Sequence, residues 1–259
     1  MKLLFYFITS LFVITIISCS DSTEPEPLFK ITKRFESSFS IDTTLTNIVV
    51  KNPIGYIFLS GVSDQINFKC VLDKTVWVKN NEQADQEMNK ITFNNSISAD
   101  SNMISLDFPL VPTNGYYCIM NLEIPSGKNV YIRNQNDGVQ TSYLINDLYA
   151  QTYNSDCVIN DHWGSLEAHT NQGNIISNLS IPVNGFCKCY SIDGDITIHI
   201  PIGSTGSVQL KTINGNVSYE NLIITTSINT SKEITGTLGN GNEMIYLEST
   251  NGDIKLIGD

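Results

Sequence analysis

The chain has 259 residues, 41% of them hydrophobic, and a formal net charge of −11. This acidic balance excludes a nucleic-acid binder, which needs positive charge, and the only local group of cations is Lys30, Lys33 and Arg34. The length is enough for one large all-β domain or two small ones.

Residues 1–18 have the form of a secretory signal. A short cationic start precedes a mostly apolar run, which is too short for a membrane-spanning helix of about 20 residues. Residues 16–19, Ile-Ile-Ser-Cys, resemble the lipobox of bacterial lipoproteins. This resemblance implies cleavage before Cys19 and acylation of its thiol, so membrane lipid is an expected partner. An ordinary signal peptide followed by an incidental cysteine is the alternative.

Residues 19–36 are predicted to form a lipidated acidic tether. Residues 20–27 are polar, acidic and proline-bearing, and such a stretch cannot collapse into a core. Ser20 directly follows Cys19, which by resemblance to known sorting rules argues against retention at the inner membrane. We expect a lipid-anchored protein of the bacterial cell envelope, at the outer membrane and facing either the periplasm or the cell surface.

Residues 37–125, the first part of a predicted domain at 37–259, are rich in strand patterns and contain one helix pattern. Strands are predicted at 46–51, 56–59, 66–72, 75–78, 103–108 and 117–124. A helix is predicted near residues 80–91, because Ala84, Met88 and Ile91 recur at helical spacing and Asn80 can cap its start.

A short pattern of a polar residue, Gly, any residue and an aliphatic residue repeats through the second half of the chain. Gly173, Gly194, Gly215 and Gly236 stand 21 residues apart, and Gly252 follows after 16. Weaker versions occur at Ile54-Gly55, at Asp137-Gly138 and at Ser155, where serine replaces glycine. Sharp corners often need φ > 0, which favours Gly, Asn or Asp and makes Ser155 the strained exception.

Strands with period-2 alternation follow the corners. Ile196, Ile198 and Ile200 share one face, while Thr197 and His199 share the other. Repeats of this length indicate stacked units, either an antiparallel meander of hairpins or a parallel β-solenoid in which each corner lies above the previous one. We predict an all-β fold and favour the β-solenoid.

The order of these features resembles that of putative adhesin domains. The shared features are a strand pair around a Gly corner, a short helix, the strand Leu122-Glu123-Ile124-Pro125 and the repeated Asn-Gly-Asp-Ile corners, and the resemblance covers roughly residues 37–259. The resemblance implies a β-solenoid related to the head domain of putative autotransporter adhesins. It does not imply a particular function, because one fold hosts many functions.

Five cysteines lie beyond Cys19, at positions 70, 118, 157, 187 and 189. We expect them to be small apolar fillers of the core, since free cysteine is among the most buried residue types. A disulfide between Cys157 and either Cys187 or Cys189 is the alternative in an oxidising compartment.

We predict no metal site and no cofactor, because His162, His169 and His199 do not repeat at ligand spacing. His162 and His199 are expected to face solvent. No catalytic residue is predicted, although Asp156, Asp193, Asp195 and Asp253 recur near corners. Turn chemistry explains these carboxylates, and a polysaccharide-cleaving β-helix enzyme is the alternative.

The leading hypothesis is a non-catalytic, lipid-anchored surface that binds an envelope protein or a glycan. The contact face is predicted from outward polar residues of the repeats, namely Thr197, His199, Gln209, Lys211, Ser218 and Glu220. A purely structural envelope protein is a third interpretation.

Overall fold

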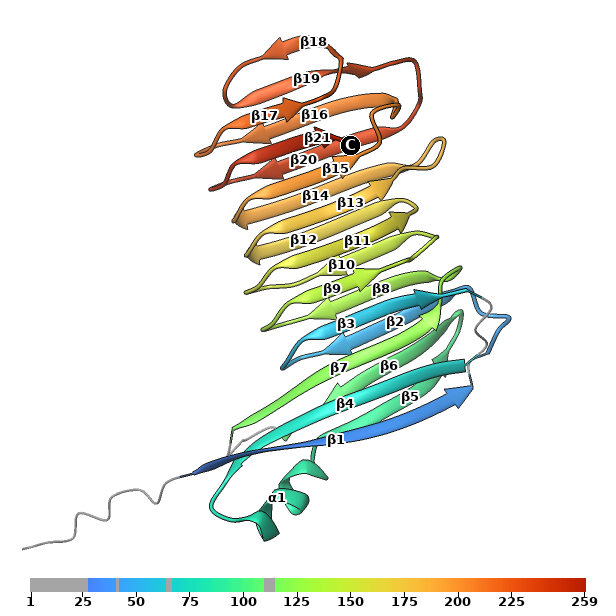
Figure 1. Cartoon of the computed structure of the whole chain (residues 1–259), viewed down its shortest axis with the longest axis vertical. Coiled ribbons are helices and arrows are strands. Elements are labelled where there is room, and N and C mark those ends of the chain that lie inside the picture. The colour runs from blue at the N-terminus through green and yellow to red at the C-terminus, as the bar shows by residue number, and fades with distance from the viewer. Residues whose placement is uncertain (1–27, 41, 64–66, 110–114) are drawn as a thin grey trace, which may run out of the picture.

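The computed structural model describes residues 28–40, 42–63, 67–109 and 115–259 (Figure 1). The predicted signal peptide and Cys19 lie outside these residues. The described part of the chain forms 21 strands and one helix, α1 (Asn81–Met88). The strands are β1 (Phe29–Ser40), β2 (Asn47–Asn52), β3 (Ile57–Val62), β4 (Asn67–Val78), β5 (Thr92–Ser98), β6 (Ser101–Asp107), β7 (Tyr116–Pro125), β8 (Asn129–Asn134), β9 (Val139–Ser142), β10 (Leu148–Gln151), β11 (Cys157–Trp163), β12 (Leu166–Gln172), β13 (Ile175–Ser180), β14 (Phe186–Asp193), β15 (Ile196–Ile200), β16 (Gly206–Thr212), β17 (Val217–Glu220), β18 (Ile224–Asn229), β19 (Glu233–Leu238), β20 (Met244–Ser249) and β21 (Ile254–Gly258).

The strands form two sheets whose neighbouring strands follow each other up the long axis of the molecule (Figure 1). The ten-stranded sheet has the order β1-β4-β7-β3-β9-β11-β13-β15-β21-β17, and the eleven-stranded sheet has the order β18-β19-β16-β20-β14-β12-β10-β8-β2-β6-β5. Each coil contributes one strand to each sheet, and equivalent strands pair in parallel, as β10 does with β12 and β11 with β13. The fold is therefore the predicted β-solenoid, and the hairpin meander does not describe its central coils.

The coils are not stacked in sequence order. The C-terminal coil, β20 and β21, lies between the coil of β14 and β15 and the coil of β16 and β17. At the other end, β2 and β3 lie between the coil of β6 and β7 and the coil of β8 and β9. The expectation that each corner lies above the previous one is wrong at both ends, because in each case a coil distant in sequence fills the gap.

Antiparallel strands close both ends of the solenoid. At the C-terminal end, β19 pairs with both β16 and β18, and Gly236 lies inside β19. The predicted corner at Gly236 is therefore wrong. At the N-terminal end, β1 pairs along its whole length with β4, which is a single strand where two were predicted at 66–72 and 75–78. Residues 29–36 consequently belong to a sheet and not to the predicted tether, because their backbone pairs with the long strand β4.

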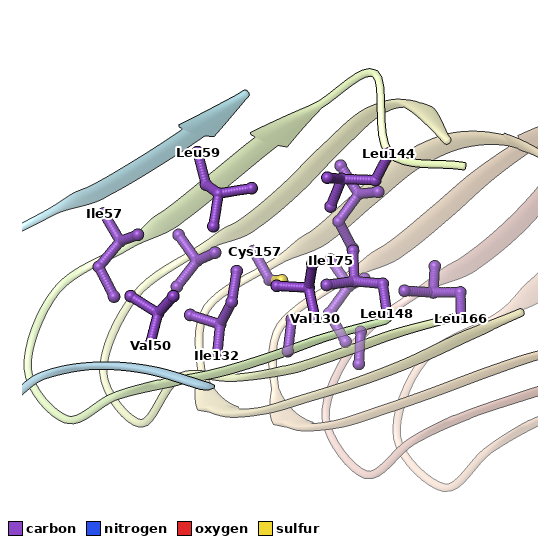
Figure 2. Packing of buried hydrophobic residues seen from close by; sticks show 14 of the residues in the cluster. Val50, Ile57, Leu59, Val130, Ile132, Leu144, Leu148, Cys157, Leu166 and Ile175 are labelled. Carbon is purple, nitrogen blue, oxygen red and sulfur yellow. The ribbon is translucent and has the colours of Figure 1, made fainter. Parts of the chain in front are cut away.

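The core lies between the two sheets and is formed by the inward residues of the coils. Figure 2 shows part of it, from Val50 and Ile57 to Leu166 and Ile175. Stacked positions carry similar side chains, such as Leu148 on Leu166 and Leu166 on Cys187. Ile196, Ile198 and Ile200 are buried as the alternation predicts. Each fully buried aliphatic side chain contributes about 1.5–3 kcal/mol relative to an exposed one, so the column of coils is stabilised along its whole length.

Helix α1 packs on β4 at the N-terminal end (Figure 1). The Asn80 side chain accepts a hydrogen bond from the backbone N–H of Gln83, so the predicted N-cap is confirmed. Ala84 and Met88 face the core. Lys74, which is only 9% exposed, donates from its ammonium group to the carbonyl oxygens of Met88 (3.3 Å) and Ile91 (2.7 Å). A buried cation thus pairs with the last carbonyl of α1 and with a carbonyl just beyond its C-terminal end.

Candidate binding surface

The corner glycines form one column on the molecule, in the spatial order Gly173, Gly194, Gly252 and Gly215. A Cβ on Gly194 would stand 1.9 Å from the Gly173 carbonyl oxygen, and a Cβ on Gly215 would stand 1.9 Å from that of Gly252. Close backbone approach therefore requires most of these glycines. Of the four, only Gly173 has a left-handed φ, and Ser155 does not, so Ser155 is not the strained exception.

Two hydrogen-bond ladders run beside this column. Inside, a buried hydroxyl three residues before each corner donates to a corner carbonyl, as Thr212 does to Gly252 (2.8 Å) and Ser249 to Gly194 (3.0 Å). Outside, a side-chain oxygen accepts from a backbone N–H of the next coil. The acceptor and donor residues are Asp156 with Asn174 (2.7 Å), Asn174 with Asp195 (2.9 Å), Asp195 with Asp253 (2.8 Å) and Asp253 with Asn216 (2.7 Å).

The outer ladder explains three of the carboxylates that suggested an enzyme. Asp156, Asp195 and Asp253 each hold the backbone of a neighbouring coil, so their spacing follows from corner construction. Asp193 accepts from the side-chain amide of Asn251 (2.5 Å). Within the described ranges, no group of three or more His, Cys, Asp or Glu side chains is arranged to hold a metal ion.

The six predicted contact residues do not share one face. Thr197 and His199 lie on β15, and Ser218 and Glu220 lie on β17, in the ten-stranded sheet. Gln209 and Lys211 lie on β16, in the eleven-stranded sheet on the other side of the core. The prediction of a single contact face is therefore wrong. Alternation separates inward from outward residues, but the two strands of each coil point their outward residues in opposite directions.

On the ten-stranded sheet, the outward groups near the C-terminus are already engaged with each other. Lys255 of β21 lies between β15 and β17 and pairs with Glu220 (Nζ to Oε1, 2.7 Å). His199 Nδ1 lies 2.7 Å from Asp259 Oδ2. These pairs are exposed and contribute little to stability.

A shallow hollow of about 200 Å³ on the same sheet is lined by residues that include Trp163, Asn178, His199 and Asp259. A β-bulge at Asp161, where φ is 48°, shifts the register of β11 here. The extra residue turns His162 inward, so the prediction that His162 faces solvent is wrong. Its Nε2 lies 3.2 Å from the Ser165 carbonyl, and burial lowers the pKa of its imidazole.

The eleven-stranded sheet carries a continuous row of aromatic rings on its outer face, which we call the aromatic row. It consists of Tyr131, Tyr149, His169, Tyr190 and Tyr246, one from each of five successive strands. Neighbouring ring centroids are 6.4, 5.5, 4.7 and 5.6 Å apart along the row. Tyr131 is 42% exposed, and the four other rings are half-buried.

Polar groups fix the rings of the aromatic row. His169 Nε2 lies 2.8 Å from Glu167 Oε1, and the Tyr246 hydroxyl donates to Glu248. This hydrogen bond and burial raise the pKa of Tyr246 to about 12. This row was not predicted from the sequence. A signal was present, because His169 and Tyr190 stand 21 residues apart, like the corner glycines.

The five described cysteines are free and fully buried, as the prediction of apolar fillers requires. Cys187 and Cys189 lie on one strand with their sulfur atoms 3.9 Å apart, and Cys157 lies on the opposite sheet. Burial raises the pKa of the Cys157 thiol to about 12. In the part of the chain with assigned structure, neither alternative disulfide is formed.

The fold and the surface together define a β-solenoid domain with closed ends and an aromatic outer face. The chain belongs to the Toastrack DUF4097 family, which matches residues 40–257. The resemblance to putative adhesin domains, expected over residues 37–259, is confirmed. Among residues 28–259, leaving aside the gaps, no helix is long and apolar enough to cross a membrane.

Solved structures of similar proteins are distant in sequence. A putative cell adhesion protein from Clostridium sporogenes is 11% identical, with a TM-score of 0.48, and the match covers 88% of this chain and 100% of the relative. A putative adhesin from Bacteroides fragilis is 10% identical, with a TM-score of 0.40, and the match covers 86% of this chain and 97% of the relative. Likenesses this distant assign no function to the chain. No curated protein matches it.

Proposed function

We propose that the protein is a non-catalytic, lipid-anchored component of the bacterial cell envelope that presents its solenoid surface to an envelope or extracellular partner. The aromatic row is the observation that supports this function best. Tyrosine is enriched at protein interfaces because its ring offers a large contact area together with a polar tip. A row of rings along the outer face of a sheet suits an extended partner better than a small enclosed ligand.

The anchor in this proposal is Cys19, and its place in the chain sets the orientation of the domain. Strand β1 begins at Phe29, beside α1 at the N-terminal end of the solenoid (Figure 1). Ten residues extend at most about 35 Å, so the acylated cysteine would hold this end near the bilayer. The strands β16–β19 would then form the end away from the lipid.

The anchor is tested by labelling cells with a radioactive fatty acid and isolating the protein. We expect label in the wild-type chain and none in Cys19→Ala, which would also leave the membrane fraction. Equal label in both chains would rule out Cys19 as the acylation site.

The binding function is tested by cross-linking the anchored protein in its own envelope and identifying what it captures. Tyr149→Ala with Tyr190→Ala should lose the captured partner. The control Phe58→Ala removes an exposed ring from β3 of the ten-stranded sheet and should keep it. Unchanged capture by the double variant would exclude the aromatic row. Capture by no variant, wild type included, would favour a purely structural protein, and release of chain ends from an acidic polysaccharide would favour the enzyme.

A further inference from the structure

Two cations lie side by side on the surface at the N-terminal end of the aromatic row. Lys51 of β2 and Arg133 of β8 are direct neighbours across a parallel strand pair, and both are exposed. None of the ion pairs formed by the described residues includes either of them. Like charges directly opposite each other on adjacent strands destabilise a sheet, so this pairing has a cost in stability.

Elsewhere on the same face, cations stand opposite acids. Lys188 lies opposite Glu167, and Lys211 lies opposite Glu248 on one side and Glu233 on the other. The side-by-side cations are therefore a local departure from the charge pattern of this sheet, in a chain whose net charge is −11.

These two cations line a hollow together with aromatic and aliphatic side chains. The hollow measures about 460 Å³, and its lining is Val49, Lys51, Met103, Tyr131, Arg133 and Tyr149. Tyr131 and Tyr149 are the first two rings of the aromatic row, with centroids 6.4 Å apart. A ligand in the hollow would thus meet two positive charges and two tyrosine rings, and the remaining rings of the aromatic row continue along the axis from that point.

We propose that this face binds a linear polysaccharide that carries carboxylates, with one carboxylate held by Lys51 and Arg133 and the sugar rings lying on the aromatic row. Arginine binds a carboxylate through two parallel N–H donors, and lysine adds a second charge-assisted hydrogen bond. Sugar rings pack on aromatic side chains, and Tyr131, which is 42% exposed, is the most accessible ring of the row. This inference rests on the proposed binding function and names its ligand.

The test is titration calorimetry of the full chain with polygalacturonate oligosaccharides at low ionic strength. We expect binding that weakens as salt is added, because the charges are exposed. The double variant Lys51→Gln with Arg133→Gln should bind on the order of tenfold more weakly or worse. Tyr131→Ala should also weaken binding, whereas Phe58→Ala should not.

Two controls separate specific recognition from general charge. Lys69→Gln with Lys255→Gln removes the same charge from exposed ion pairs on the ten-stranded sheet and should bind like the wild type. Polyglutamate, which has carboxylates but no sugar rings, should bind much more weakly than the oligosaccharide. Equal losses in the two double variants, or equal binding of polyglutamate, would overturn the proposal.

The outcome is separable from the proposed function. In one outcome, the wild-type chain does not bind the acidic oligosaccharide and yet captures a partner through the aromatic row in its envelope. In that case the glycan assignment is wrong and the binding function stands. If both experiments are negative, both are wrong.

Discussion

A buried hydroxyl three positions before each corner holds the backbone of the solenoid together. Thr212 is 4% exposed, and its hydroxyl donates to the Gly252 carbonyl of the neighbouring coil. Thr141 is equally buried on β9, but its hydroxyl has no partner among the described residues. The hydroxyl of Thr212 therefore contributes a hydrogen bond to stability, and that of Thr141 does not.

We expect Thr212→Val to lower the free energy of unfolding by about 1–3 kcal/mol, because a buried carbonyl loses its donor. Thr141→Val, the matched control, should leave stability unchanged or raise it, since the valine buries no unpaired hydroxyl. Urea unfolding of both variants measures this. Equal losses in the two variants would show that the hydrogen bond is not the cause.

His162 makes stability depend on pH in one direction. Its pKa is lowered by burial, so the unfolded chain takes up a proton at a higher pH than the folded chain. The contribution is fully present above the unfolded pKa of about 6.5 and is lost as the pH falls through that value toward the lower folded pKa.

The free energy of unfolding should therefore fall between about pH 7.5 and 5.5, and His162→Gln should flatten the decline. The half-exposed His199 provides the control, since His199→Gln should keep most of the decline. Urea unfolding at a series of pH values measures both, and an unchanged slope in His162→Gln would assign the pH dependence to other groups.

At the scale of single elements, helix α1 depends on a residue of strand β4. Lys74 of β4 donates to the carbonyls of Met88 and Ile91, and burial lowers the pKa of its ammonium group. A helix of this length is marginal without tertiary support. The lysine and the packing of Ala84 and Met88 supply that support.

Lys74→Met should unlock the end of α1 and speed amide hydrogen exchange at residues 88–91, with a loss of about 1–3 kcal/mol in unfolding free energy. Lys90→Met removes an exposed ion pair with Glu87 and should change exchange little. Hydrogen exchange followed by mass spectrometry distinguishes the two. Protection retained in Lys74→Met would show that packing alone holds the helix.

Elements with a regular pattern were predictable, and elements defined by distant partners were not. The helix, its Asn80 cap and the inward isoleucines of β15 follow from local spacing. Residues 29–36 of β1 were assigned to the tether because their polar side chains support a strand only beside β4. The six contact residues were placed on one face because period-2 alternation does not tell which sheet an outward residue belongs to.

At the scale of the whole molecule, the final coil is an internal part of the column. β20 and β21 separate β14 and β15 from β16 and β17. Because equal corner spacing fits any stacking order, the sequence could not reveal this insertion. The step of 16 residues from Gly236 to Gly252 gave no sign of it, because Gly236 lies inside β19 and is not a corner.

Removing residues 244–259 should abolish cooperative unfolding, because the deletion opens a gap inside the core instead of shortening an end. In a solenoid wound in sequence order, loss of the last repeat leaves its neighbours folded. Circular dichroism against urea measures this, and a synthetic peptide of residues 240–259 added to the truncated chain should restore the transition. A truncated chain that still unfolds cooperatively would contradict the inserted position of this coil.

The inserted coil also bears on how the protein is made. While the C-terminal strands are still inside the ribosome, β16 and β17 have no partner coil on which to stack. We therefore expect the nascent chain to stack its coils as far as β15, and β16 and β17 to join the column only after β20 and β21 have been synthesised. Chains that end before β20 therefore lack the coil on which β16 and β17 stack, and we expect them to expose unpaired strand edges.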